Sequence, residues 1–132
     1  LPASLRVLRA PTLEALEATL TRHPRPRTLL VDSLNTVSTD GASDPGAPRQ
    51  LLACARRLVA FAKTGRVVIL VAHLNTENQI AGTRRVRYLV DVVLRFEAEA
   101  GGSSWRRLWA TKNRFGPAGE IGRLEMTPRG LA

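Results

Sequence analysis

The sequence predicts an α/β fold in which a mainly parallel sheet, flanked by helices, is followed by a C-terminal antiparallel meander. Two apolar runs of strand length, at residues 28–32 and 66–72, are separated by a segment whose apolar residues recur at helical spacing. Strands joined by a helix run parallel. Three strand-like segments then follow at short spacing, at residues 91–97, 105–113 and 120–126, which favours antiparallel pairing.

The first part of the chain predicts a strand, a helix and a second strand. Residues 5–8 predict a short strand, and Pro11 then starts a helix that Thr12 can cap. Glu14 suits the first turn of this helix, whose apolar face consists of Leu13, Leu16 and Leu20. The HPRPR segment at residues 23–27 ends the helix, because proline cannot continue it. These signals together predict a β-α-β unit.

A long polar loop precedes the second helix. Residues 35–48 contain glycine and proline and are long for a connection inside a compact domain, which indicates a functional loop. A helix is predicted at residues 49–64, and Gly65 is well placed to end it. Its apolar residues at helical spacing are Leu51, Leu52, Ala55, Leu58, Val59 and Ala62. The strand at 66–72 completes a second crossover, and residues 84–90 predict a short helix.

Composition limits the class of protein. A chain of 132 residues that is 44% hydrophobic is expected to form one globular domain. Cys54 is the only cysteine, which excludes a disulfide framework, and with only His23 and His73 besides it no metal-ligand cluster is apparent. No apolar run approaches the roughly 20 residues that span a bilayer, so a cytoplasmic protein without a membrane partner is expected.

The net charge of +9 comes almost entirely from arginine. The arginine side chain is a planar fork suited to phosphate, which favours a nucleic-acid partner; a coding bias or a generic solvated surface is the alternative. Residues 84–114 contain eight basic and three acidic residues. Trp105 and Trp109 alternate in phase on one predicted strand, and we interpret them as packing groups rather than as stacking platforms for bases.

Two candidate site residues follow predicted strands. Asp32 ends the strand in the stretch TLLVDSLNT, and ligands of open α/β sheets bind outside the carboxyl ends of the strands. An aspartate there can hold Mg²⁺ through water and position nucleotide phosphates; the alternative is an aspartate that caps the turn. His73 follows the strand at 66–72 and is expected at the same edge, where it is either a site residue or a hydrogen-bonded turn residue.

Five motifs together resemble one known family. TLLVDSLNT, PGAPRQ, VAHLNTENQIAGTRR, YLVDVVLRFE and TKNRFGPAGEIGRLEM occur in the order and approximate spacing seen in the RadA/Sms family. That family comprises bacterial recombination and repair ATPases with a RecA-type core, related to DnaB-type replicative helicases. The resemblance covers nearly the whole chain, and KNRFG is its most specific part. It implies a partial RecA-like P-loop NTPase core.

The resemblance implies roles for the strand-end residues. Asp32 matches the Walker B aspartate that serves Mg²⁺ and ATP, and Ser33 follows it as in the family. Asn35 stands where the family usually has glutamine. Gln50 matches a glutamine that begins the helix after the first DNA-facing loop, and His73 matches a histidine placed to sense the state of the nucleotide. Ser33, Gln50 and His73 are therefore expected to be nucleotide-sensing residues.

The resemblance also implies contacts to DNA and to a neighbouring subunit. The loops at 38–48 and 74–83 match the two DNA-facing loops of RecA-type cores. Lys112 and Arg114 match a basic pair that reaches the γ-phosphate bound to a neighbouring subunit, where a cation offsets charge on the transferred group; the alternative is a solvated β-turn edge. They are expected to be catalytic together with Asp32.

The second DNA-facing loop departs from the family pattern. Asn75, Thr76 and Asn78 replace the threonine, lysine and glycine of the histidine motif, so a basic contact is missing. Arg85 and Arg87 stand where the family has apolar and acidic residues. We hypothesise that the arginines compensate for the lost lysine; the expected DNA-binding residues are Asn75, Arg84, Arg85 and Arg87.

The largest departure is that G-x-x-x-x-G-K-[ST] occurs nowhere in the 132 residues, although that loop cradles the phosphates in this class of ATPase. In the family this loop and a four-cysteine zinc module precede the matched part, and a Lon-protease-like domain follows it. Residues 1–132 are therefore expected to form a single partial RecA-like domain that neither binds ATP tightly nor hydrolyses it alone.

Two functional hypotheses follow from the resemblance. The first is part of an ATP-dependent DNA motor for branch migration, which acts on single-stranded or branched DNA as a homo-oligomeric ring. The second is a non-enzymatic DNA- or partner-binding remnant. Asp32, Lys112 and Arg114 favour the first hypothesis, because a remnant has no need of groups aimed at a phosphate. The exchanged loop residues favour the second.

Overall fold

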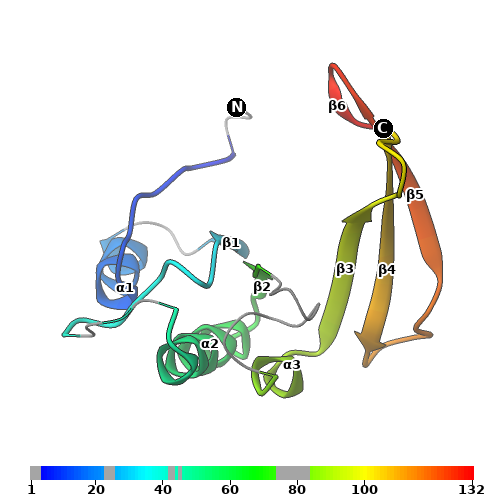
Figure 1. Ribbon diagram of the computed structural model, residues 1–132. Helices are drawn as coiled ribbons and strands as arrows, with labels where there is room; N and C mark the ends of the chain where they lie inside the picture. Colours follow the sequence, from blue (N-terminus) through cyan, green and yellow to red (C-terminus); the bar gives the residue numbers. More distant parts are fainter. Residues whose placement is uncertain (1–3, 23–25, 42–43, 45, 74–83) are drawn as a thin grey trace. The chain divides into compact units, whose positions relative to one another are not determined.

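The computed structural model describes residues 4–22, 26–41, 44, 46–73 and 84–132. They form two compact units, Leu1–Leu89 and Val90–Ala132. In order along the chain (Figure 1), the elements are α1 (Leu13–Arg22), β1 (Thr28–Asp32), α2 (Pro48–Ala62), β2 (Val67–Val71), α3 (Val86–Leu89), β3 (Val92–Ala98), β4 (Trp105–Asn113), β5 (Ile121–Thr127) and β6 (Gly130–Leu131). None of the described helices has the length and apolar content needed to cross a membrane.

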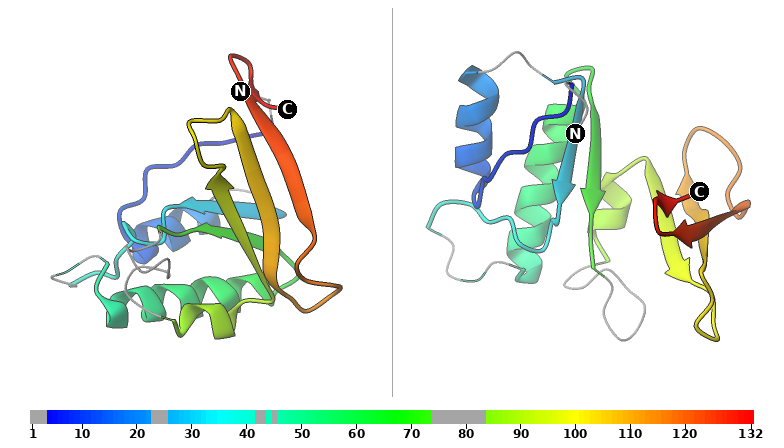
Figure 2. Two further views of the ribbon diagram at one scale, coloured as in Figure 1. Left: turned by 45° about the vertical axis from the view of Figure 1, so that its right-hand side comes forward. Right: turned by 90° about the horizontal axis from the view of Figure 1, so that it is seen from above.

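The first unit contains the predicted β1-α2-β2 crossover. β1 and β2 pair in parallel from Thr28 opposite Val67 to Asp32 opposite Val71, and they lie side by side in both views of Figure 2. α1 begins as expected from the sequence, since the backbone N–H of Ala15 donates to the Thr12 hydroxyl oxygen at 3.2 Å. Local sequence signals therefore place these elements correctly.

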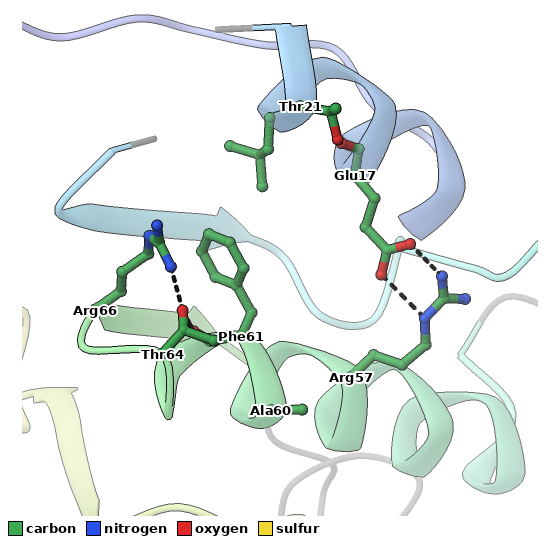
Figure 3. A pocket seen from close by; sticks show the side chains of 8 residues that line it. Glu17, Thr21, Arg57, Ala60, Phe61, Thr64 and Arg66 are labelled. Carbon is green, nitrogen blue, oxygen red and sulfur yellow. Dashed lines mark hydrogen bonds and ion pairs between the residues drawn. The ribbon is translucent and has the colours of Figure 1, made fainter. Parts of the chain in front are cut away.

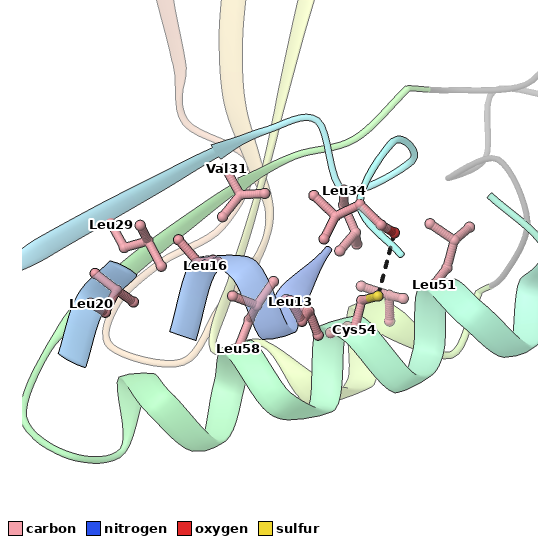
Figure 4. Close-up of a cluster of buried hydrophobic side chains, with 12 residues drawn as sticks. Leu13, Leu16, Leu20, Leu29, Val31, Leu34, Leu51, Cys54 and Leu58 are labelled. Carbon is pink, nitrogen blue, oxygen red and sulfur yellow. Dashed lines mark hydrogen bonds between the residues drawn. The ribbon is translucent and has the colours of Figure 1, made fainter. Parts of the chain in front are cut away.

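One core connects α1, β1 and α2 (Figure 4). The predicted α1 face is buried and packs with β1 and α2; the cluster includes Leu13, Leu16, Leu20, Leu29, Val31, Leu51 and Leu58. Cys54 on α2 is fully buried, and its thiol donates to the carbonyl oxygen of Val37 at 3.4 Å. Burial raises the pKa of the Cys54 thiol, so this cysteine is a neutral packing group.

Only one face of the parallel sheet is buried, although the strands of parallel sheets are commonly buried on both faces. Leu29 and Val31 point toward the core, while Leu30 between them is 59% exposed. Ile69 of β2, which is opposite Leu30 in the register, is also exposed, and so is Val67 two residues before it. The physical reason is that α1 and α2 both contribute to the cluster on the Leu29 side of the sheet.

Two parts of the predicted architecture are wrong. The sheet is not mainly parallel, because two strands pair in parallel and four form a separate antiparallel sheet. Residues 5–8 do not form a strand; they are irregular, and Leu5 and Val7 are exposed. A short alternating segment becomes a strand only where a neighbour accepts its hydrogen bonds. The chain pairs instead at Leu13, whose N–H donates to the Ser38 carbonyl oxygen at 2.8 Å.

The second unit is the predicted antiparallel meander, in the order β3-β4-β5-β6. β4 and β5 pair from Trp105 opposite Glu125 to Trp109 opposite Ile121, so both indole rings lie on one face. The guanidinium carbon of Arg123 lies 4.9 Å from the Trp105 ring centre, and that of Arg107 lies 5.5 Å from the Trp109 ring centre. Arginine therefore covers both aromatic rings within the sheet.

Arg57 of α2 joins the two helices by binding two glutamates of α1. Its guanidinium donates to the Glu14 carboxylate and to Glu17, with 3.2 Å between Nε and a Glu17 oxygen. The Arg57 hydrogen bond and, less strongly, the backbone N–H of Asp40 hold the pKa of Glu14 below its ordinary value of 4.5. The ionised form of Glu14 is thus favoured by folding.

We expect Glu14→Gln to destabilise the first unit at neutral pH but not in acid. A lowered folded-state pKa stabilises the fold above the ordinary pKa of 4.5, and this stabilisation disappears as pH falls through the folded-state value. Thermal unfolding across pH measures the effect, with Glu120→Gln at an exposed site as the control. An equal difference between wild type and Glu14→Gln at every pH would contradict the assignment.

Candidate functional site

The candidate site lies where β1 and β2 end. Asp32 and Val71 are opposite each other in the parallel register, which confirms that Asp32 and His73 follow neighbouring strands at the same sheet edge. Two of the hydrogen bonds between described residues join the segment after β1 to the end of β2 and to the residues that follow it. The N–H of Leu34 donates to the Val71 carbonyl oxygen at 2.8 Å, and the N–H of His73 donates to the Asn35 side-chain oxygen at 2.9 Å.

Asp32 and Ser33 differ in exposure. The Asp32 carboxylate is exposed, whereas Ser33 is only 4% exposed. The peptide bond between them is cis. Within the described part of the chain the buried Ser33 hydroxyl has no hydrogen-bond partner, and it is next in sequence to the exposed Asp32 carboxylate. The Ser33 carbonyl oxygen accepts from the Thr36 hydroxyl at 2.9 Å, which closes the turn.

These two residues fit the expected Mg²⁺ and nucleotide. Mg²⁺ usually keeps several water molecules and is bound through one or two carboxylates together with phosphate oxygens. No group of three or more potential metal-ligating side chains occurs among the described residues, so any site at Asp32 that these residues form has at most two such side chains. One exposed carboxylate beside an unpaired hydroxyl suits a hydrated cation and not a protein-enclosed metal centre such as structural zinc.

Gln50 lies on α2 and connects this helix to the loop that follows β1. Its side-chain nitrogen donates to the Thr39 hydroxyl at 2.9 Å and lies 3.7 Å from the Cys54 sulfur. These contacts fix the position of the loop at Thr39. Its proposed role as a nucleotide sensor stays a prediction.

The predicted DNA-binding arginines lie at and just before α3. Arg84, Arg85 and Arg87 are exposed, and α3 packs against α2 through the buried side chain of Val86. Arg85 lines a shallow hollow of about 120 Å³ together with Arg49, Pro48 and Leu52. Sequence reasoning did not place Arg49 beside Arg85, because the contact between α2 and α3 that brings them together is not a local signal. Asn75 lies outside the described residues.

Lys112 and Arg114 belong to the second unit, and the first two residues of that unit, Val90 and Asp91, bind their side chains. The Lys112 ammonium donates to the Val90 carbonyl oxygen at 2.6 Å, and the Arg114 guanidinium binds the Asp91 carboxylate at 2.9 Å. The Arg114 side chain is still 73% exposed, so it is open to a further anion. The described contacts thus bring Asp32, Ser33 and His73 to one edge, and Lys112 and Arg114 to another part of the chain.

A larger hollow of about 450 Å³ lies between α1 and α2 (Figure 3). Its walls include Phe61, with the Arg66 guanidinium carbon 4.8 Å from the ring centre, and the ion-paired Glu17 and Arg57. Arg66 directly precedes β2, so this hollow lies at the amino end of the strand. Ligands of α/β sheets bind at the opposite end, and the hollow is therefore not our candidate site.

Comparisons with known proteins agree with the motifs. No family model matches the chain. The DNA repair protein RadA of Brucella abortus is 47% identical over 109 residues, which is 81% of this chain and 23% of the relative. RadA of Pseudomonas aeruginosa is 40% identical over 129 residues, 96% of this chain and 28% of the relative. RadA of Bacillus subtilis is 38% identical over 130 residues, with 97% and 28% covered.

Two solved structures share the fold. A DnaB-like replicative helicase, described with its interactions with primase, superposes with a TM-score of 0.62 at 17% identity, covering 87% of this chain and 32% of that chain. The RadB recombinase superposes with a TM-score of 0.58 at 16% identity, covering 89% and 56%. These likenesses show a RecA-like α/β fold. The chain spans about a quarter of the length of its RadA relatives, and over that span it belongs to the RadA family of DNA repair proteins.

Proposed function

We propose that this chain acts in DNA repair and recombination as part of an ATP-dependent, DNA-binding motor that processes branched recombination intermediates. The observation that supports this most directly is the strand edge where Asp32 stands exposed beside the buried, unpaired Ser33 hydroxyl, with His73 joined to the same edge by Asn35. This arrangement offers a cation and phosphate site at the carboxyl ends of parallel strands. The RadA relatives support the repair role.

In this proposal each residue has a defined task. The Asp32 carboxylate accepts hydrogen bonds from water held around the cation, and the Ser33 hydroxyl donates to a neighbouring oxygen. Mg²⁺, when bound with ATP, neutralises charge on the transferred phosphoryl group. Lys112 and Arg114 act on the nucleotide of a neighbouring subunit in a homo-oligomeric ring. For that, their present bonds to Val90 and Asp91 must be exchanged for phosphate.

A chimera tests the proposal, because the 132 residues contain no G-x-x-x-x-G-K-[ST] loop. This chain replaces the matching segment of Pseudomonas aeruginosa RadA, with which it aligns over 129 residues. We expect the chimera to hydrolyse ATP in a Mg²⁺-dependent reaction that single-stranded DNA stimulates, as measured beside the intact relative. A folded chimera without ATP turnover would contradict the proposal.

The 132-residue chain itself should bind DNA through its basic α3 segment. We expect neutralisation of Arg84, Arg85 and Arg87 together to weaken binding of a single-stranded oligonucleotide. The slope of log affinity against log salt should fall by about 2, since each lost phosphate contact removes about 0.7. Fluorescence anisotropy across salt concentrations measures this effect. The control removes three exposed arginines elsewhere, Arg9, Arg22 and Arg129; an equal loss there would show that only total charge matters.

A non-enzymatic DNA-binding remnant is the second candidate function. The exchanged residues of the histidine motif and the lack of a phosphate loop in these residues favour it. In that case the oligonucleotide binding above remains, while the chimera fails to turn over ATP. The two assays therefore separate the candidates.

A further inference from the structure

Asn35 lies where three segments of the first unit meet. It follows β1 by three residues, and its side-chain oxygen accepts the N–H of His73, the second residue after β2, at 2.9 Å. Its own carbonyl oxygen faces Gly46, near the end of the loop that leads to α2. A Cβ at Gly46 would lie 3.3 Å from that oxygen, and the φ of +92° there also favours glycine.

The Asn35–His73 bond is distinct from the strand pairing. The sheet itself ends at Asp32 opposite Val71, and the Leu34–Val71 hydrogen bond is made by backbone atoms alone. The bond at His73, in contrast, depends on the Asn35 side chain. A change of residue at position 35 can therefore release His73 while the backbone pairing stays intact.

We propose that Asn35 is a positioning residue that couples the Asp32 edge to the backbone at His73. This inference rests on the proposed function and names the residue that holds the His73 backbone at the end of the site where Asp32 stands. A shift of the turn after Asp32 moves the Asn35 side-chain oxygen, and the hydrogen bond of 2.9 Å carries this movement to the His73 backbone. Asn35 itself neither binds the cation nor contacts a phosphate in this account.

Three substitutions separate coupling from packing. Asn35→Asp keeps a side-chain oxygen at the same distance from the backbone, Asn35→Ala removes it, and Asn35→Ser is too short to reach. In the 132-residue chain, hydrogen exchange at the His73 amide should accelerate about fivefold in Asn35→Ala and Asn35→Ser. Asn35→Asp should retain wild-type exchange. Exchange that is unchanged in Asn35→Ala would overturn the inference.

The functional test uses the chimera described above. We expect Asn35→Ala to keep basal ATP turnover and to lose most of the stimulation by single-stranded DNA, and Asn35→Asp to restore it. A loss of basal turnover and stimulation in equal proportion, or full stimulation in Asn35→Ala, overturns the coupling role. If Asn35→Ala does not fold, Asn35→Ser takes its place. A wild-type chimera without DNA stimulation contradicts the proposed function instead, so the two failures are distinguishable.

Discussion

Asp32→Asn in the chimera is expected to reduce Mg²⁺-dependent ATP turnover by about 100-fold or more. Asparagine has nearly the same size as aspartate, but it lacks the charge that holds a hydrated cation beside the phosphates. Because Asp32 is exposed, removing its charge leaves no buried group unpaired, and the fold should remain intact. Steady-state ATP hydrolysis measured across Mg²⁺ concentrations tests this directly.

Asp40→Asn is the matched control for this substitution. Asp40 is an exposed carboxylate in the loop that follows β1, and it contacts Glu14 through its backbone N–H and not through its side chain. We expect its neutralisation to leave ATP turnover unchanged. If Asp32→Asn keeps wild-type turnover, or if Asp40→Asn loses as much, Asp32 does not have the proposed role.

Leu51→Ala is expected to lower the free energy of unfolding of the first unit by about 2–5 kcal/mol. Leu51 is completely buried on α2, between the loop after β1 and the cluster from α1, so truncation leaves a cavity. Both helices of eight or more residues lie in the first unit, whereas both tryptophans lie in the second. Urea unfolding followed by far-ultraviolet circular dichroism therefore reports mainly on the affected unit.

The half-buried Leu52 on the same helix supplies the control. Leu52→Ala removes the same number of carbon atoms from a position that is partly open to water, so the loss should be smaller. Tryptophan fluorescence recorded in parallel follows the meander. Equal destabilisation by the two substitutions would show that the core is not centred on Leu51.

The sequence predicts most elements of the fold because their signals are local. Thr12 and the leucine stripe that follows it predict α1, and Gly65 predicts the end of α2. Each signal lies within or next to the helix that it predicts, and the structure has both helices. The strand expected at residues 5–8 is wrong for the opposite reason. Its alternation is a local signal, but a strand also needs a partner that supplies hydrogen bonds, and sequence pattern does not name that partner.

The candidate site was predictable only in outline. The proximity of Asp32 and His73 follows from a general rule, since the carboxyl ends of neighbouring parallel strands meet at one edge. The bond between the Asn35 side chain and the His73 backbone depends on turn geometry, and the unpaired Ser33 hydroxyl depends on burial. The contacts of Lys112 and Arg114 with Val90 and Asp91 depend on the register of β3 against β4, which the sequence alone does not set.

The most direct measurement is the DNA stimulation of ATP turnover in the chimera, compared between Asp32→Asn and the variant with Arg84, Arg85 and Arg87 neutralised. We expect Asp32→Asn to lose both basal and stimulated turnover. The arginine variant should keep basal turnover and lose stimulation, because these residues contact DNA and not the nucleotide. The arginine variant must not lose basal turnover as well, and at least one variant has to change the ratio of stimulated to basal turnover. Either failure would contradict the claim that Asp32 serves the nucleotide while Arg84, Arg85 and Arg87 serve DNA.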